Sequence, residues 1–253
     1  MFDLEKHNTF KMKVKAKNGL FINTAEDLNK VDTDKYLILG SGSDVLFVDD
    51  YEGTVLINAI KSLEIKHEGN FYKVRAGGGI LLDSLISELV DKGAYGLENL
   101  SAVPGTVGAA PVQNVGAYGV EVGDYIESVE FFDLRTKESG RLLKKDCLFT
   151  YRHSIFKEDI AKSWFITYVN FSLPDTLRLT LRIRELKEKV FLALKRYGIR
   201  LLLCAAPSFL ILNLWVMPAV SLKILLLIKR PLMRLKLNIR MLLSILLKTV
   251  FIN

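Results

Sequence analysis

The chain has 253 residues, a net charge of +7 and a hydrophobic content of 50%, which is enough for one large domain or two smaller ones with a buried core. The charge is unevenly divided, because residues 174–253 carry a net +12 and residues 1–173 a net −5. This division excludes a basic nucleic-acid-binding surface spread over the whole chain, and we expect no nucleic-acid partner.

Glycine divides the chain at the same place, since 16 of the 17 glycines precede residue 174. We therefore treat residues 1–173 and 174–253 as separate regions. The N-terminal sequence MFDLEKHNTF has acidic residues where a signal peptide needs basic and apolar ones, so we expect a cytoplasmic protein. The two cysteines, Cys147 and Cys204, form no metal-spaced pair. They favour a reducing compartment with buried thiols, and we expect no metal site.

The first region opens with short elements. Residues 10–14 alternate between apolar and polar side chains, which predicts a short strand, and residues 24–29 are typical of a helix start. Residues 36–39 and 45–48 are predicted as buried strands, separated by the turn Gly-Ser-Gly-Ser at 40–43. Successive amides in such a turn can bind an anion such as a pyrophosphate, although a plain tight turn is the more frequent explanation.

Clearer periodicity follows in the middle of the chain. Apolar residues between Leu81 and Asp91 recur at a spacing of three and four, which predicts an amphipathic helix, and Gly93 is expected to end it. Stretches with the composition and turn boundaries of strands are found at 54–60, 62–69, 71–79, 126–134 and 140–143. The last two are expected to form a hairpin.

The stretch 104–119, PGTVGAAPVQNVGAYG, is the feature around which the chain is organised. It contains four glycines, three alanines and no charged residue, so its backbone can approach a bound partner closely. A surface connection is the alternative, but a connection of this length without secondary structure is usually functional. We therefore interpret residues 104–119 as a loop that surrounds a ligand.

An arginine at 152 is the candidate for contact with an anion. It follows Tyr151 in an apolar strand-loop context, where burial of a guanidinium is costly unless it faces a negative group. A surface arginine that pairs with Glu158 or Asp159 is an equally weighted alternative. His153 is interpreted as a hydrogen-bonded structural residue rather than a base.

Four motifs in this order resemble the UDP-N-acetylenolpyruvoylglucosamine reductase family: NTF at 8–10, LGSGSDVLF at 39–47, GLENLSAVPGTVGAAPVQNVGAYG at 96–119 and YRHSIFK at 151–157. The resemblance implies an α+β fold with an FAD-binding domain of the vanillyl-alcohol-oxidase/PCMH type, made of two subdomains. We assign these subdomains to residues 1–80 and 81–173. In the family, a third domain then binds the substrate.

The resemblance also implies an activity. This activity is the FAD-dependent, NADPH-driven reduction of UDP-N-acetylenolpyruvoylglucosamine to UDP-N-acetylmuramate, a peptidoglycan precursor, so a nucleotide sugar is the expected partner. Arg152 matches the family's active-site arginine, and a fixed cation there would stabilise negative charge that develops on the substrate. Tyr118 and Tyr151 are implied to border the substrate. The residues implied to hold FAD are Gly40, Ser41, Gly42, Ser43, Asp44, Pro104, Gly105, Gly108, Ala109, Ala110 and Gly116.

Residues 174–253 depart from the family pattern. The family's proton donor is a serine within GNAGSFFKNP, assisted by a glutamate near the C-terminus, and this chain has neither that segment nor an acidic residue after Glu188. Residues 201–222 contain no charge and scan as a transmembrane helix with a basic flank. A membrane-anchored FAD-binding protein that uses residues 201–228 as its anchor is therefore one hypothesis. A non-enzymatic sugar-nucleotide-binding module is another.

A change of reading frame explains the tail more fully. One permitted set of codons for residues 214–225 reads, from its third base, as MGNAGSFFKNP, and residues 203–214 in the same offset can give VRRSKLPDPKLM. We therefore predict that the chain leaves the family frame near Leu173, that the third domain is missing or scrambled, and that no membrane partner is involved. Without the serine and the glutamate, we expect little or no reductase turnover.

Overall fold

The computed structural model describes residues 1–32 and 34–176. The fold below is that of these residues. The predictions for the tail, including Cys204, the 201–228 anchor and the out-of-frame segment, lie outside the described residues. Within the described residues, no helix is long and apolar enough to cross a membrane.

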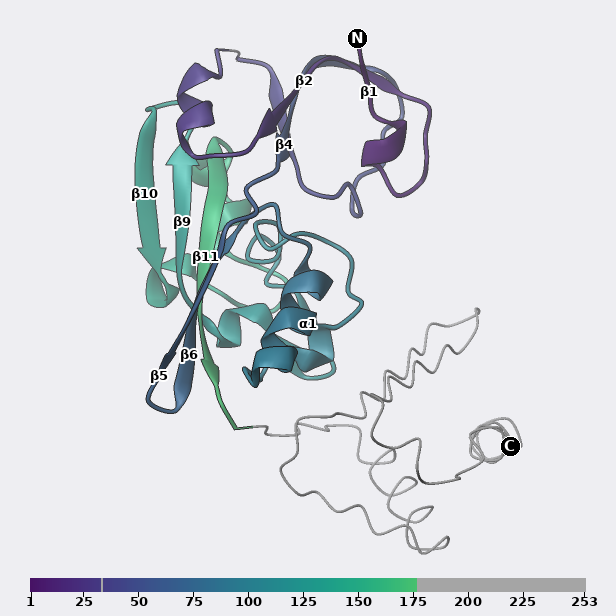
Figure 1. Cartoon of the computed structure of the whole chain (residues 1–253). Helices are drawn as coiled ribbons and strands as arrows, with labels where there is room; N and C mark the ends of the chain where they lie inside the picture. The colour runs from purple at the N-terminus through teal and green to yellow at the C-terminus, as the bar shows by residue number, and fades with distance from the viewer. Residues whose placement is uncertain (33, 177–253) are drawn as a thin grey trace, which may run out of the picture. The chain divides into compact units, whose positions relative to one another are not determined.

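The first sheet contains four strands in the order β1-β2-β4-β3 (Figure 1). Its strands are β1 (Phe2–Asp3), β2 (Lys15–Ile22), β3 (Tyr36–Leu39) and β4 (Tyr51–Asn58). Both β2 and β3 run parallel to β4, and β1 is antiparallel to β2. Consecutive residues 53–57 of β4 are all buried, which is typical of a central parallel strand covered on both faces.

The second sheet is antiparallel throughout, with the order β10-β9-β11-β6-β5. Its strands are β5 (Leu63–Glu68), β6 (Phe71–Gly77), β9 (Ile126–Asp133), β10 (Glu138–Leu143) and β11 (Trp164–Pro174). The predicted strands at 62–69 and 71–79 and the hairpin at 126–143 are therefore confirmed. Strand β11 lies at the centre of the sheet and was not among the predicted strands.

Helix α1 (Leu82–Lys92) packs on one face of the second sheet (Figure 1). Its apolar residues at the predicted spacing are buried against residues of β6, β9 and β11. Gly93 ends the helix with a left-handed backbone, φ +84°, and its amide donates to the carbonyl groups of Leu89 and Val90. The predicted helix and its glycine cap are confirmed.

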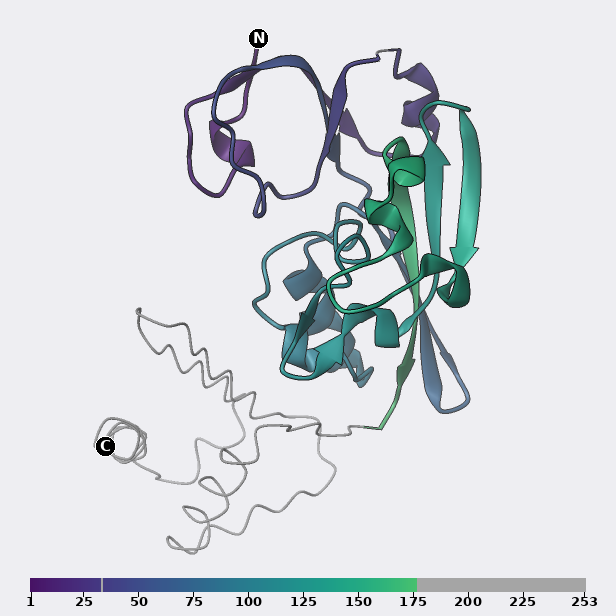
Figure 2. The ribbon, with the colours of Figure 1, turned by 180° about the vertical axis from the view of Figure 1, so that it is seen from behind.

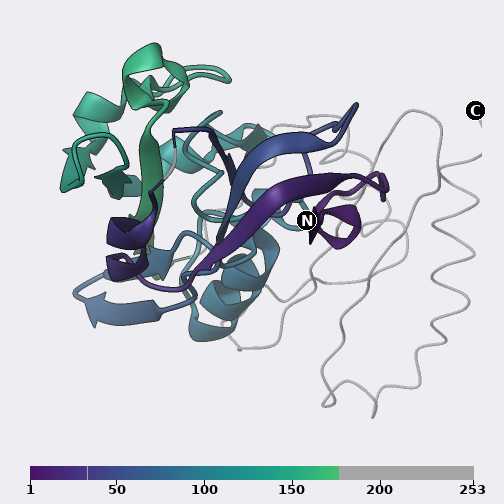
Figure 3. The ribbon, with the colours of Figure 1, turned by 90° about the horizontal axis from the view of Figure 1, so that it is seen from above.

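The two sheets share an apolar core. Figure 3 shows the ribbon from above, with the paired strands β2 and β4 side by side. Ile22 and Leu56 from the first sheet pack in one cluster with Phe132 and Phe165 from the second. The ends of β3 and β4 and the first turns of α1 line one cavity. The candidate site is built at this junction.

The remaining elements are short and lie in the connections between the longer strands and α1 in both sheets (Figure 2). They are the strands β7 (Gly116–Ala117) and β8 (Val120–Glu121) and the 3-10 helices η1 (Glu5–His7), η2 (Glu26–Lys30), η3 (Glu98–Leu100), η4 (Val122–Asp124), η5 (Lys144–Cys147), η6 (Ile155–Lys157) and η7 (Asp159–Ala161). Cys147 at the end of η5 is buried, and its burial raises the pKa of the thiol to about 12. The expected burial of the thiol is confirmed for Cys147.

The predicted strand at 10–14 is wrong. Lys11 has a left-handed backbone, and the side chain of Asn8 bonds both the amide and the carbonyl of Met12. The segment is therefore folded into a loop by an asparagine, and the first long strand begins at Lys15. Its alternation still buries Val14, while Phe10 remains exposed.

The predicted strand at 45–48 is also wrong. Phe47 is buried, but Leu46 and Val48 are 62% and 81% exposed, and the segment pairs with no strand. Both edges of β4 are already occupied by β2 and β3, so an additional apolar segment has no neighbour there. The helix start at 24–29 is confirmed only as the short 3-10 helix η2, where the Asp27 carboxylate accepts from the amides of Asn23 and Thr24.

Candidate functional site

Two glycine-containing segments lie against each other where the sheets meet. A Cβ atom added to Gly40 would lie 2.7 Å from Oγ1 of Thr106 and 3.6 Å from Cβ of Ala109. On the other side, Ser43 Oγ is 4.0 Å from the position of a Cβ on Gly105. The turn at 40–43 and the loop at 104–110, which were each predicted to bind a ligand, are thus brought together.

Gly42 is held in place by the N-terminal loop. Its backbone is left-handed, φ +66°, and an added Cβ would overlap the carbonyl oxygen of His7. Its own carbonyl accepts a hydrogen bond of 3.1 Å from the amide of Thr9. The NTF motif at 8–10 therefore acts by clamping the turn.

Asn8 shapes this clamp, a role that the sequence did not indicate. Its buried side-chain amide donates to the carbonyl of Leu4 at 2.8 Å and to that of Met12 at 3.0 Å, and its Oδ1 accepts from the Met12 amide at 2.9 Å. These three bonds close the loop at 4–12 around one side chain. Its place in the NTF motif at 8–10 was the available signal.

The loop at 104–110 also runs along the chain that enters α1. The amide of Gly108 donates to the carbonyl of Gly78 at 2.9 Å, and the amide of Leu82 donates to the carbonyl of Gly105 at 3.1 Å. A Cβ on Gly108 would lie 3.1 Å from Nδ2 of Asn58 and from Cα of Gly78. The three consecutive glycines at 77–79 belong to the site, because the loop at 104–110 can come this close to them only where the backbone carries no side chain.

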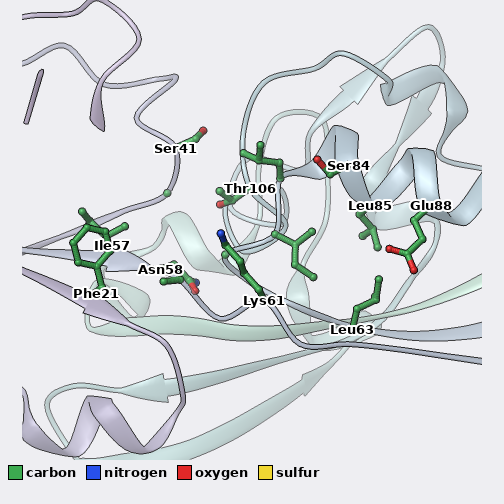
Figure 4. A pocket seen from close by; sticks show the side chains of 15 residues that line it. Phe21, Ser41, Ile57, Asn58, Lys61, Leu63, Ser84, Leu85, Glu88 and Thr106 are labelled. Atoms are coloured by element: carbon green, nitrogen blue, oxygen red, sulfur yellow. The ribbon is translucent and has the colours of Figure 1, made fainter. Parts of the chain in front are cut away.

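An open cavity of about 580 Å³ lies beside these segments (Figure 4). This volume falls within the range of small-molecule sites, which is roughly 300–1,000 Å³. The cavity is lined by Phe21, Gly40, Ser41, Ile57, Asn58, Ala59, Lys61, Leu63, Gly79, Ile80, Leu81, Ser84, Leu85, Glu88 and Thr106. Most of its wall is apolar, with a few polar groups from the turn, the loop and the two charged side chains.

Of the residues implied to hold FAD, only Gly40 and Ser41 line this cavity. The others flank it or lie further along the two segments. Gly42, Gly108 and Ala110 are buried, whereas Asp44, Pro104 and Ala109 are exposed, and Ser43, Gly105 and Gly116 are half-buried.

Arg152 is exposed, so of the two alternatives the structure favours a surface arginine. Its Nη2 donates a hydrogen bond of 2.9 Å to the carbonyl of Gly116, which joins the arginine to the end of the glycine-rich loop. The alternative partners are engaged elsewhere, since Glu158 lies 3.2 Å from Nε2 of His153 and Asp159 lies 2.6 Å from Lys162. The backbone of Arg152 is left-handed, φ +55°, a costly conformation that is often found at functional positions.

Asn114 fixes the loop to the arginine segment and was not predicted. Its buried side chain donates to Oε2 of Glu121 at 2.6 Å and to the carbonyl of Thr150 at 3.0 Å, and it accepts from the amide of Gly123 at 2.9 Å. Its backbone is also left-handed, φ +43°. The residue before Tyr151 and Arg152 is therefore attached directly to the centre of the loop.

The two tyrosines implied to border the substrate are exposed at the surface. Tyr118 is 47% exposed with a left-handed backbone, and Tyr151 is 83% exposed. Neither lines the cavity beside the turn. Their proximity to a substrate stays a prediction.

Glu98 stands out among the titratable groups near the loop. Its Oε2 accepts from the amide of Gly96 at 2.7 Å, while its Oε1 is buried and has no hydrogen-bond partner in residues 1–32 and 34–176. Burial raises the pKa of this carboxyl above its ordinary value. Folding therefore shifts the protonation equilibrium of Glu98 toward the neutral carboxyl, relative to the unfolded chain.

We expect Glu98→Gln to raise the melting temperature at pH 7. When folding raises the pKa of a carboxyl, the protonated group favours the folded state. This stabilisation is fully present at a pH below the pKa of the unfolded chain, and it is lost as the pH rises through the pKa of the folded protein. Glutamine stays neutral and keeps an acceptor for Gly96, so the gain should shrink toward zero on acidification to about pH 4, near the ordinary carboxyl pKa. Thermal melts at several pH values test this, with exposed Glu138→Gln as the control. A gain that does not depend on pH would contradict the explanation.

Comparison with known proteins identifies the fold. A family profile described as "FAD binding domain" matches residues 22–138, which include both glycine segments. A crystal structure of UDP-N-acetylenolpyruvylglucosamine reductase from Thermus caldophilus is similar with a TM-score of 0.57 and 26% identity, over 76% of this chain and 67% of that one. The expected α+β fold with an FAD-binding domain is confirmed.

Curated relatives give a closer match in sequence. The UDP-N-acetylenolpyruvoylglucosamine reductase of Pseudoalteromonas translucida is 42% identical over 173 residues, covering 68% of this chain and 51% of that protein. The reductase of the same name from Buchnera aphidicola subsp. Schizaphis graminum is 34% identical, covering 79% of this chain and 60% of that protein. The chain thus spans about half the length of the curated relatives that it matches. Because 79% of 253 residues is about 200, the second alignment extends beyond Leu173.

Proposed function

Since the chain belongs, over the residues it shares with them, to the UDP-N-acetylenolpyruvoylglucosamine reductase family, we propose that it binds FAD at the junction of the two sheets. One observation carries this proposal. The turn at 40–43 and the loop at 104–110 face each other with bare backbone beside a cavity of about 580 Å³. Their amides are suited to a diphosphate and the apolar wall to a ring system.

We propose further that the activity is the reduction of UDP-N-acetylenolpyruvoylglucosamine with NADPH, in the cytoplasm. Bound FAD would supply hydride transfer between NADPH and the enolpyruvyl group. The chain's own part is to hold the cofactor by the turn and the loop, and to place Arg152 where the substrate carboxylate gains negative charge. The bond from Arg152 to the Gly116 carbonyl supports this role, because a preorganised cation lowers the barrier without rearranging during the reaction.

We propose that the chain as written turns over slowly, because the family's serine donor and C-terminal glutamate are missing from residues 174–253. We propose that the departure from the family pattern lies after Leu173, and the Buchnera alignment, which extends beyond that residue, supports this position. The frame change would then lie between Leu173 and residue 203, because the offset reading VRRSKLPDPKLM begins at residue 203.

A comparison of two proteins tests this function. One is the chain as written, and the other has its coding DNA shifted so that the offset frame supplies KLPDP and GNAGSFFKNP. We expect substrate-dependent NADPH oxidation from the second and little from the first, with FAD bound by both. Comparable rapid turnover from the chain as written would contradict the role assigned to the missing segment. Absence of turnover in the shifted protein, with FAD bound, would contradict the reductase assignment.

A further inference from the structure

The cavity beside the turn is lined by only two charged side chains, Lys61 and Glu88. Lys61 follows β4 and projects into the cavity, with Glu88 on the opposite side from Ser41 (Figure 4). Among residues 1–32 and 34–176, no ion pair within 4.0 Å involves the Lys61 ammonium. A positive group thus faces the cavity without a carboxylate to neutralise it.

The backbone position of Lys61 is fixed by hydrogen bonds of the two adjacent residues, Ile60 and Ser62. Ile60 is buried, and its carbonyl accepts from the amide of Gly79 at 2.9 Å. On the other side, the carbonyl of Ser62 accepts from the amide of Gly77 at 2.8 Å. The backbone at 61 is therefore fixed on both sides to the three-glycine segment, and only the flexible stem of the lysine is free to adjust.

The turn at 40–43 needs a cation that it does not contain. Its sequence Gly-Ser-Gly-Ser is uncharged and is followed directly by the carboxylate of Asp44. A diphosphate brings two negative charges, and amides alone supply only partial positive charge. Lys61 is the cation that shares a cavity wall with Gly40 and Ser41.

We propose that Lys61 binds the diphosphate of the dinucleotide cofactor and neutralises part of its charge. This inference rests on the proposed function, because it assumes that the cavity holds FAD. The turn then orients the diphosphate through its amides and hydroxyl groups, and Lys61 adds the charge-assisted hydrogen bond. Glu88, at the other side of the cavity, opposes the same anion and limits its affinity.

Flavin fluorescence titrations of the full chain test the proposal. Lys61→Gln should weaken FAD binding roughly 10- to 100-fold, the cost of losing a hydrogen bond to a charged group. Lys61→Arg should retain most of the affinity, and Glu88→Gln should leave it equal or slightly tighter. Riboflavin, which has no phosphate, should bind equally to the unaltered chain and to Lys61→Gln. Lys66→Gln on exposed β5 is the control.

The outcomes separate this inference from the proposed function. If the unaltered chain binds FAD and Lys61→Gln binds it equally well, the role of Lys61 is overturned and FAD binding stands. A thermal shift with ADP extends the test: if the unaltered chain binds ADP but not FAD, and Lys61→Gln loses ADP, the FAD proposal fails while Lys61 keeps its role as a diphosphate ligand. If neither ligand binds, both proposals are overturned. Melting temperatures without ligand should be equal for all variants, because Lys61 and Glu88 are exposed.

Discussion

Gly42→Ala is expected to abolish FAD binding and to lower the free energy of unfolding by roughly 2–4 kcal/mol. Two costs combine at this position. The left-handed backbone at φ +66° is unfavourable for alanine, and the new Cβ would overlap the carbonyl oxygen of His7. The turn could relieve the overlap only by moving away from the N-terminal clamp, and that movement would displace the amides from the diphosphate. Urea denaturation and FAD titration measure the two effects.

Gly69→Ala provides a matched control for this prediction. Gly69 has nearly the same backbone, φ +60°, but no atom lies within 4 Å of an added Cβ. The substitution should therefore cost only the backbone strain, about 1–2 kcal/mol, and leave FAD binding intact. Equal effects of the two substitutions on FAD binding would contradict a specific role for the turn.

Arg152→Ala is expected to reduce the turnover number of the frame-restored protein by about 10²–10³, the usual cost of removing one preorganised group that stabilises developing charge. FAD content should not change, because Arg152 bonds the Gly116 carbonyl and does not line the cavity. Steady-state NADPH oxidation and the flavin absorbance of the purified protein separate the two quantities.

Two further variants sharpen the interpretation of Arg152. Arg152→Lys keeps the charge but loses the planar guanidinium, so an intermediate rate is expected. Arg135→Ala removes another exposed arginine, which pairs with Asp133 away from the loop, and should leave the rate unchanged. Loss of flavin together with activity in Arg152→Ala would show that the residue supports the fold of the site rather than the reaction.

Local periodicity was sufficient to predict α1 and the two hairpins of the second sheet, β5-β6 and β9-β10. It failed where an element depends on distant partners. Residues 45–48 have the composition of a strand but find no free sheet edge, and residues 10–14 are bent by the side chain of Asn8. Strand β11 carried a usable signal, since the apolar residues Val169, Phe171 and Leu173 alternate with polar ones and are the buried side chains.

The glycine-rich segments of the candidate site could be predicted from the sequence, but the side chains that hold these segments in place could not. Glycine-rich composition identified the turn at 40–43 and the loop at 104–119, because few other roles require so many residues without side chains. Asn8 and Asn114 could not be identified in this way, since their roles come from hydrogen bonds to loops that only the folded chain brings near. The importance of Lys61 likewise became evident only because the structure places it on the wall of the cavity that Ser41 also lines.

Titration of the purified full-length chain with FAD, followed by flavin fluorescence and visible absorbance, tests the central claim most directly. We predict saturable binding of one FAD per chain, with a perturbed flavin spectrum and an increased melting temperature. A folded chain that leaves the flavin spectrum and its own melting temperature unchanged at saturating FAD would contradict the claim that the two glycine segments form a cofactor site.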